Sequence, residues 1–220
     1  LHLCRVLHER TGHSNLCVTG GVGLNSVVNG KILEETPFER LYVTPAAGDS
    51  GTAIGAAAFG HRTLTSVVPR WHQPHDFLGA GYGSAPIRAA IERFPGLVEV
   101  EALPDAPERA AADLVEGRVV GWFEGGSEFG PRALGHRSIL ADPRPPDMRD
   151  RLNDRVKFRE PFRPYAASVL EEERAAWFQT GAPDPYMLLV AEVVPERRAQ
   201  IPAVVHFDGT CRIQTVGRDH

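Results

Sequence analysis

Cysteine and lysine are both scarce in this chain of 220 residues. The three cysteines, Cys4, Cys17 and Cys211, lie far apart and show no C-x-x-C spacing. This odd number argues against a disulfide framework and against a cysteine zinc site, and it is compatible with a reducing cytoplasm. Lysine occurs only at Lys31 and Lys157, so arginine supplies nearly all of the 24 basic residues. We interpret this as a bias of genomic composition.

Long apolar runs are also missing. No segment approaches the roughly 18 apolar residues of a membrane span, and no signal peptide is visible. We therefore expect a cytoplasmic protein with no membrane partner. The net charge of −4 does not favour nucleic acid as a partner either. A hydrophobic content of 42% is ordinary for a globular protein with a sizeable core.

Helices and strands alternate in the first part of the chain. This alternation predicts an α/β layer, with ligand loops at the carboxyl ends of the strands. Because Leu1 lies inside a predicted helix and is not methionine, we expect the natural N-terminus to lie upstream. The predicted helices cover residues 1–10, 25–35 and 50–59, and the predicted strands cover residues 16–19 and 41–44.

A second region follows a stretch in which this alternation is lost. Prolines and glycines among polar and aromatic residues predict a linker over residues 67–84. His72 and His75 lie in this linker, where surface histidines are a better interpretation than a metal site. A mixed α+β region is predicted from residue 85 onward. Its predicted helices are 86–94, 107–116, 147–155 and 171–178, and its strands are 119–123, 166–170, 187–194 and 212–216.

The most informative stretch is residues 124–137, EGGSEFGPRALGHR, between two predicted strands. Its four glycines allow positive φ and a close approach of the backbone to a ligand. Arg132, His136 and Arg137 place hydrogen-bond donors around the same turn, and the arginine fork matches phosphate or carboxylate oxygens. The chemistry indicated is recognition of a phosphorylated or nucleotide-like anion. An ordinary glycine turn with solvated arginines is the alternative.

A second basic cluster, the motif RLNDRVKFREPFRPYAASVL over residues 151–170, continues from this loop. Residues 130–165 hold nine Lys and Arg against five Asp and Glu, a net +4 inside an acidic chain. This local charge favours a small anionic ligand. Prolines fix the direction of the cations, and interleaved aromatic residues indicate a partly buried basic pocket, with a solvated surface as the alternative. The candidate binding residues here are Lys157, Arg159, Arg163 and Tyr165.

Two strand–glycine–helix motifs occupy the first part of the chain. In TGGVGLNSVVNG, residues 19–30, Gly20, Gly21 and Asn25 could form a phosphate loop at a helix N-terminus, or a tight turn without a ligand. In PAAGDSGTAIGAA, residues 45–57, Gly48 and Gly51 leave the backbone open on either side of Asp49. That carboxylate suits a helix N-cap, which is the more common role, a metal ligand or a general base. The pair resembles the C-terminal half of an actin/Hsp70/sugar-kinase nucleotide fold.

Three stretches of the chain resemble the O-carbamoyltransferases of antibiotic and nodulation-factor biosynthesis. They read GGVGLNSVVNGKILEETPFERLYVTPAAGDSGTAIGAA, EGGSEFGPRALGHRSILADPR and KFREPFRPYAASVL. The resemblance implies the end of an actin-like (ASKHA) domain over residues 1–66 and an α+β YrdC-like domain over residues 85–220. The family's upstream half, with its His-x-x-x-His metal ligands, and a downstream segment are absent. We therefore interpret the chain as a middle and C-terminal fragment.

The resemblance also implies an activity. The YrdC-like part would use carbamoyl phosphate and ATP to make carbamoyladenylate, and the ASKHA-like part would pass the carbamoyl group to a hydroxyl acceptor with the help of a divalent metal, iron. Asp49 matches the metal-ligand aspartate, and Gly20, Gly21 and Asn25 match the nucleotide-phosphate loop. Arg132, His136, Arg137, Lys157 and Arg163 match the basic residues around the phosphates, and a homodimer is a further expected assembly.

Two other functions stay open at this point. One is a different ASKHA phosphotransferase, such as a sugar kinase, although a kinase does not require the second basic cluster. The other is a non-catalytic nucleotide-binding module. ATP-dependent consumption of carbamoyl phosphate would distinguish the three.

Overall fold

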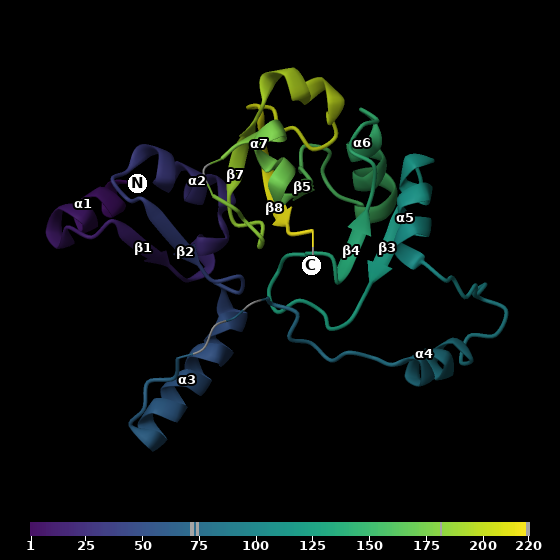
Figure 1. Cartoon of the computed structure of the whole chain (residues 1–220), viewed down its shortest axis with the longest axis horizontal. Coiled ribbons are helices and arrows are strands. Elements are labelled where there is room, and N and C mark those ends of the chain that lie inside the picture. The colour runs from purple at the N-terminus through teal and green to yellow at the C-terminus, as the bar shows by residue number, and fades with distance from the viewer. Residues whose placement is uncertain (71–72, 74, 181, 219–220) are drawn as a thin grey trace. The chain divides into compact units, whose positions relative to one another are not determined.

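The computed structural model describes residues 1–70, 73, 75–180 and 182–218, so His72 lies outside the described residues (Figure 1). The chain has a mixed α/β fold with small sheets and forms two compact units. Unit 1 consists of Leu1–Asp76, Phe129–Arg132 and Pro143–His220. Unit 2 consists of Phe77–Glu128 and Ala133–Asp142.

The first elements of unit 1 confirm the predicted alternation of helix and strand. Helix α1, His2–Thr11, ends at Gly12 with φ of 67°. Strands β1, Asn15–Val18, and β2, Arg40–Val43, pair in parallel. Helix α2, Ser26–Glu35, connects them and buries Ile32 against Leu16 and Phe38. This small apolar cluster holds the layer together.

Helix α3, Thr52–Thr65, is longer than the predicted helix over residues 50–59. A 3-10 turn, η2 (Asp49–Gly51), precedes it. The predicted helix ended at residue 59 because the sequence pattern of alternating helices and strands is lost soon after it. The helix continues nonetheless, and none of its residues is buried. Its length therefore does not depend on an apolar face packed against a core.

A four-stranded sheet in the order β5-β8-β7-β6 forms the second part of unit 1. Strand β8 is central, parallel to β5 and antiparallel to β7. The largest apolar cluster of the described chain packs here and includes Val193, Cys211 and Ile213. The strands are β5, Ala166–Leu170; β6, Phe178–Gln179; β7, Val190–Val193; and β8, Thr210–Val216.

Short helices complete unit 1. The predicted helix over residues 171–178 is divided into a 3-10 turn and one helical turn, because Phe178 is already extended and enters β6. Strand β7 begins at Val190, later than predicted, since Met187 has a positive φ of 56°. The helices are α6, Met148–Leu152; the π-helical turn η3, Asn153–Lys157; η4, Glu171–Glu173; α7, Arg174–Trp177; and η5, Pro195–Gln200.

Unit 2 consists of two helices and a hairpin. Helix α4 spans Ser84–Ile91, and helix α5 spans Ala106–Val115. Asp105 caps α5, because its carboxylate accepts a hydrogen bond from the backbone N–H of Glu108 at 2.8 Å. Strands β3, Val120–Phe123, and β4, Arg137–Leu140, pair antiparallel on either side of the glycine-rich loop.

The domain boundaries expected at residues 66 and 84 stay predictions. Unit 1 contains both the β1–β2 layer and the four-stranded sheet. Gly30 of α2 packs on β7, and a Cβ at Gly30 would lie 3.0 Å from the carbonyl oxygen of Val190. Among the described residues, no helix has the length and apolar character that a membrane span requires. The ASKHA-like and YrdC-like assignments stay predictions.

Two glycines of the second motif should respond in opposite ways to alanine. A Cβ at Gly51 would collide with the carbonyl oxygen of Ala46, so Gly51→Ala should lower the free energy of unfolding by about 1–3 kcal/mol. A Cβ at Gly55, inside α3, meets open space. Gly55→Ala should therefore raise stability by about 0.5–1 kcal/mol. Urea denaturation of both variants measures this, and equal effects would contradict the close approach at Gly51.

Candidate functional site

The two glycine motifs of unit 1 lie against each other. Gly20, with φ of 87°, leads into a 3-10 turn, η1 (Gly21–Leu24). A Cβ at Gly23 in this turn would lie 3.1 Å from the Cβ of Ala47. A Cβ at Gly48 would lie 3.5 Å from a methyl of Leu24. The predicted phosphate loop and the Asp49 turn are therefore neighbours in the fold.

A third segment, Phe129–Arg132, crosses both motifs. Gly130 has φ of 141°, and a Cβ there would lie 2.9 Å from the carbonyl oxygen of Pro45. Arg132 donates from Nη2 to the carbonyl oxygen of Leu24 at 2.8 Å. The structure thus brings three separate sequence motifs together in unit 1, with Arg132 at their junction.

Buried Asn29 ties this junction to the approach to β7. Its Nδ2 donates to the carbonyl oxygens of Gly23 at 2.8 Å and Leu188 at 2.9 Å. Its side chain is almost wholly buried, with 1% of its surface exposed. Because a buried amide without partners is costly, these two bonds fix the η1 turn relative to the segment before β7.

Asn25, by contrast, has a structural role in this arrangement. Its Oδ1 accepts a hydrogen bond from the backbone N–H of Val28 at 3.2 Å and caps α2. The cap uses the oxygen that faces the helix N-terminus. A contact from Asn25 to phosphate stays a prediction, as does the contact from Gly21.

Two arginines of unit 1 share a partly dry environment. Burial lowers the pKa of Arg132, and the carboxylate of Asp184 opposes this shift. Burial also lowers the pKa of Arg212 to about 10, and the positive charges of Arg132 and Arg159 add to that effect. The Nε atoms of Arg132 and Arg212 are buried and have no hydrogen-bond acceptor among the described residues. A bound oxyanion would compensate both the lost hydration and the mutual repulsion.

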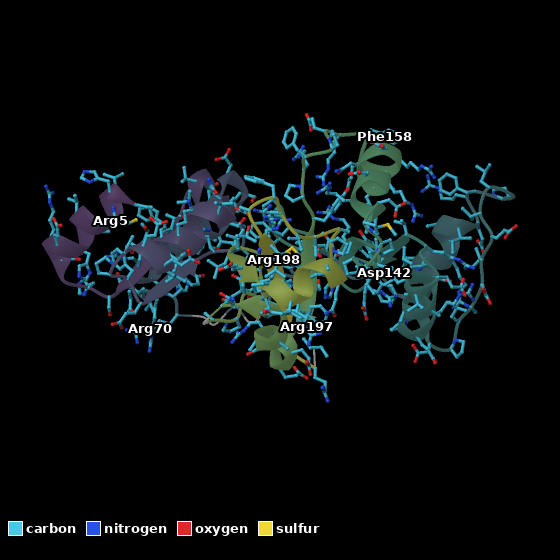
Figure 2. The ribbon with its side chains drawn as sticks, turned by 90° about the horizontal axis from the view of Figure 1, so that it is seen from above. Arg5, Arg70, Asp142, Phe158, Arg197 and Arg198 are labelled. Carbon is cyan, nitrogen blue, oxygen red and sulfur yellow. The ribbon has the colours of Figure 1, made fainter. Side chains whose placement is uncertain are left out.

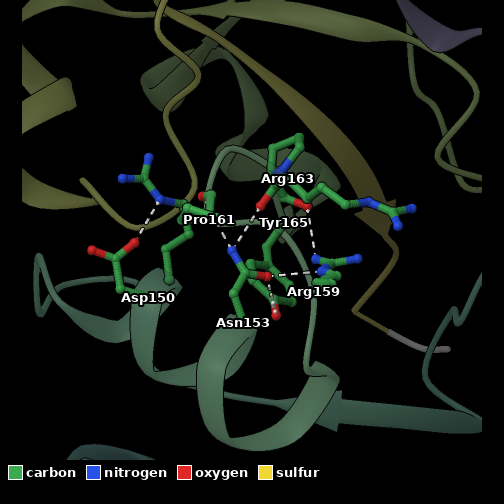
Figure 3. Close-up of polar contacts among 8 residues, drawn as sticks. Asp150, Asn153, Arg159, Pro161, Arg163 and Tyr165 are labelled. Carbon is green, nitrogen blue, oxygen red and sulfur yellow. Dashed lines mark hydrogen bonds and ion pairs between the residues drawn. The ribbon is translucent and has the colours of Figure 1, made fainter.

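The third arginine of this group is held by neighbouring side chains (Figure 3). Arg159 donates from Nε to Oδ1 of Asn153 at 2.8 Å, and its guanidinium carbon lies 4.6 Å from the ring centroid of Tyr165. Tyr165 also donates its hydroxyl hydrogen to Oδ1 of Asn153, at 3.0 Å. Burial raises the pKa of Tyr165, and the charge of Arg159 opposes this. Arg159 and Tyr165 are therefore held together through Asn153, and their role in a basic binding pocket stays a prediction.

The carboxylate of Asp184 acts electrostatically on two of these cations, Arg132 and Arg212. Burial raises the pKa of this carboxyl, while backbone N–H groups and Arg212 act to lower it. Its oxygens accept hydrogen bonds from the N–H groups of Tyr186 at 3.2 Å and Leu189 at 2.6 Å. Asp184 therefore shapes the turn before β7 and contributes one negative charge beside Arg132 and Arg212.

Two of the predicted binding residues remain on the surface. Lys157 is exposed at the end of the π-helical turn. Arg163 is exposed and lies 3.9 Å from a carboxylate oxygen of Glu160, a contact too long and too solvated to hold it firmly. Phe158, which follows Lys157 in the sequence, projects at the outer edge of this segment with 82% of its surface exposed (Figure 2).

In unit 2, one buried carboxylate organises the rest of the glycine-rich loop. Oε1 of Glu128 accepts hydrogen bonds from the backbone N–H groups of Leu134 at 2.7 Å, His136 at 3.0 Å and Arg137 at 3.1 Å. Burial of the Glu128 carboxyl acts to raise its pKa, but these bonds outweigh burial, and the pKa is lowered. The loop therefore folds around its own acidic residue.

The side chains of His136 and Arg137 belong to this loop. His136 donates from Nδ1 to the carbonyl oxygen of Glu124 at 2.6 Å. Its ring stacks on Phe77 with centroids 3.4 Å apart. Arg137 is exposed at the start of β4. Catalytic roles for both stay predictions, since Arg132 belongs to unit 1 and these two residues belong to unit 2.

Asp49 does not cap a helix, which corrects the more common of its three sequence interpretations. It lies inside η2, and neither that turn nor α3 receives a hydrogen bond from a capping side chain. Its carbonyl oxygen, not its carboxylate, accepts a bond from Thr52 at 2.5 Å. No group of three or more His, Cys, Asp or Glu that could hold a metal occurs among the residues described. The described residues alone therefore do not fit the implied iron site.

Sequence reasoning missed four residues of these sites: Asn153, Asp184, Glu128 and Arg212. Polar residues at alternate positions of β8 were an available signal for one of them. Cys211 and Ile213 are buried on one face, so Arg212 had to lie on the other face of a central strand. Nothing in the sequence indicated that Asn153, Asp184 and Glu128 would each bind several groups of the surrounding loops.

Comparison with known proteins identifies relatives of this chain. The family model described as Carbamoyltransferase C-terminus matches residues 111–220, and the model described as Carbamoyltransferase N-terminus matches residues 1–58. Nodulation protein NolNO of Sinorhizobium fredii is 42% identical over 99% of this chain and 33% of its own length. Nodulation protein NolO of Bradyrhizobium diazoefficiens is 40% identical over 99% of this chain and 40% of its own length.

Nodulation protein U of Rhizobium tropici is similar to the same extent, with 41% identity over 96% of this chain and 35% of its own length. The chain thus spans between 33% and 40% of the length of these curated relatives. What it shares with them covers both units, including all three sequence motifs.

The hydrogen bonds to Glu128 should make the free energy of unfolding fall as the pH becomes acidic. The lowered pKa means that this carboxylate stabilises the fold above its ordinary pKa of 4.5, and that the contribution is lost as pH falls through the folded value. Glu128→Gln should reduce stability at pH 7 by about 1–3 kcal/mol and should flatten the pH dependence below pH 5. Glu124→Gln, at an exposed carboxyl, is the matched control. Unchanged acid unfolding of the Glu128 variant would contradict this role.

The missing cap at Asp49 has a measurable consequence. Asp49→Ala should change the unfolding free energy by less than about 0.5 kcal/mol, where loss of an N-cap would cost about 0.5–2 kcal/mol. Asp105→Ala, which removes an observed cap, provides the comparison within the same chain. Thermal melts compare the two, and an equal loss at both positions would restore the capping interpretation of Asp49.

Proposed function

The chain belongs to the carbamoyltransferase family, and we propose that it takes part in ATP-dependent O-carbamoyl transfer from carbamoyl phosphate, through carbamoyladenylate, to a hydroxyl acceptor. The observation that carries the proposal is the group of Arg132, Arg159 and Arg212 in unit 1. Each of these cations interacts electrostatically with at least one of the others, and two have buried donors that lack an acceptor among the described residues.

The proposed chemistry needs such a group of arginines. Carbamoyl phosphate, ATP and water would give carbamoyladenylate, phosphate and pyrophosphate, and all of these reactants and products except water are anions. Arginines in a partly dry site stabilise phosphate oxygens strongly and need little reorganisation when the charge moves. In the second step, the acceptor oxygen would form a bond to the carbamoyl carbon, AMP would leave, and one proton would be released.

The residues around the glycine motifs suit the same proposal. Gly20 and Gly48 leave backbone N–H groups approachable, and Arg132 closes their junction. We propose that this part of unit 1 belongs to an ASKHA-like nucleotide site and that Arg159, Arg163 and Lys157 belong to the carbamoyladenylate-forming region. A natural product or a sugar would be the hydroxyl acceptor. Asp49 would become a metal ligand only together with residues outside this chain.

A different ASKHA phosphotransferase and a non-catalytic nucleotide-binding module are the alternatives. Both would bind ATP, but neither would consume carbamoyl phosphate. Incubation with radiolabelled carbamoyl phosphate, with and without ATP, therefore separates the three. Pyrophosphate release that requires both substrates supports the proposal. ATP binding without consumption of carbamoyl phosphate by the full-length enzyme would rule it out.

Arg212→Gln offers a test in which affinity and stability move in opposite directions. Burial lowers the pKa of Arg212 to about 10, so its charge costs folding energy, and removing that charge should leave the melting temperature unchanged or higher. Loss of a charge-assisted contact should weaken carbamoyl phosphate binding by roughly 1.5–3 kcal/mol. Titration calorimetry and thermal melts measure both quantities.

Arg93→Gln is the control for this test, because Arg93 is exposed in unit 2 and its replacement removes the same charge. Equal losses of affinity in both variants would show that only net charge matters. A large drop in the melting temperature of Arg212→Gln would assign that arginine a structural role instead.

A further inference from the structure

Asn153 is a fully buried amide whose hydrogen bonds all go to one loop (Figure 3). Its exposed fraction is 0%, and it begins the π-helical turn η3. Nδ2 donates to the carbonyl oxygens of Pro161 at 3.3 Å and Arg163 at 3.1 Å. Oδ1 accepts from Arg159 at 2.8 Å and from Tyr165 at 3.0 Å. One side chain therefore uses both amide hydrogens and both oxygen lone pairs.

The backbone around Asn153 reinforces this arrangement. Its own carbonyl oxygen accepts the backbone N–H of Arg159 at 3.1 Å. Phe158, between them, has a positive φ of 49°, which is unusual for a bulky residue and turns the chain back toward Asn153. π-helical turns are frequent at functional sites. The loop after η3 is thus closed on Asn153 through both its main chain and its side chain.

These contacts divide the cations of the loop into two classes. Arg159 is fixed by Nε to Asn153, by Nη2 to the carbonyl oxygen of Pro164 at 3.3 Å, and by the ring of Tyr165. These bonds leave further N–H groups of the guanidinium available in a fixed plane. Lys157 and Arg163 are exposed and have no comparable restraint among the described contacts.

We propose that Asn153 is the positioning residue of the anion site: it holds Arg159 as a rigid planar fork for a ligand that presents two oxygens side by side, a phosphate or acyl phosphate group. The ligand class rests on the proposed function above. The positioning itself rests on the four hydrogen bonds of the Asn153 amide. A fork that is already oriented loses less side-chain entropy when the anion binds.

The neutral amide is required by the charges around it. A carboxylate at this position would form an ion pair with Arg159 and cancel the charge that the anion needs. It would also place an oxygen against the carbonyl oxygens of Pro161 and Arg163, which need a donor. Protonation of such a carboxyl would restore one donor and remove the negative charge. With an aspartate here, anion binding should therefore be weak at high pH and should strengthen as the pH falls.

Asn153→Asp in the 220-residue chain tests the proposal, with sulfate as the probe because its charge is constant between pH 4.5 and 8.5. At pH 8 the variant should bind sulfate about tenfold more weakly than the wild-type chain, as for one charge-assisted hydrogen bond. The ratio of the two affinities should approach one as pH falls and the new carboxyl is protonated. Asn15→Asp, at an exposed position of β1, adds the same charge away from the loop.

A pH-independent ratio, or the same pH dependence in Asn15→Asp, would overturn the proposal. Arg159→Lys covers the case in which Asn153→Asp does not fold, because it keeps the charge but loses the planar fork. A loss of about tenfold in sulfate affinity supports a positioned fork, and no loss contradicts it. If wild type binds sulfate with these properties but the full-length enzyme does not consume carbamoyl phosphate, the proposed function fails and the positioning role of Asn153 stands.

Discussion

The repulsion between desolvated guanidinium groups is the constraint around which unit 1 is organised. Arg132 and Arg212 are both partly removed from water, and the positive charge of Arg132 adds to the lowering of the pKa of Arg212. Desolvated like charges cost free energy that the protein without a ligand does not regain. They persist only where many other contacts of the fold hold them in place. The single carboxylate of Asp184 offsets part of this cost. The fold therefore holds positive charge in place before any anion is bound.

Buried polar side chains provide these contacts, because each of them forms hydrogen bonds with several groups of a nearby loop. Asn29 binds two carbonyl groups, Asp184 and Glu128 accept backbone N–H groups, and Asn153 uses its whole amide. In each case the loop has little regular secondary structure of its own. The loops consequently depend on satisfied polar networks, in which loss of one member leaves several partners without a bond.

The sequence was sufficient to predict the elements whose signals are local. The helix predicted over residues 25–35 corresponds to α2, and the alternation of α1, β1, α2 and β2 followed from apolar spacing. The end of α3 was missed because no core contact marks it, and the late start of β7 was missed because Met187 adopts a positive φ.

The sequence singled out Arg132 and Arg159 by their motifs, and their binding roles stay predictions. It did not indicate the residues that they contact far along the chain. The contact of Arg132 with Leu24 spans 108 positions, and the location of Arg212 depends on which strands flank β8. Asn153 and Glu128 are also of residue types that are common on surfaces, so only the folded chain reveals that they are buried.

The preference for guanidinium over ammonium groups in this pocket also has a consequence for self-modification. An unprotonated lysine amine attacks activated carbonyl carbons, whereas a guanidinium stays protonated and is a poor nucleophile at neutral pH. In the proposed reaction an activated carbamoyl group would form beside Arg132, Arg159 and Arg212, none of which can capture it. Lys157, the one amine of the basic cluster, is exposed to solvent at the end of η3. The three arginines would therefore stay unmodified by the proposed intermediate.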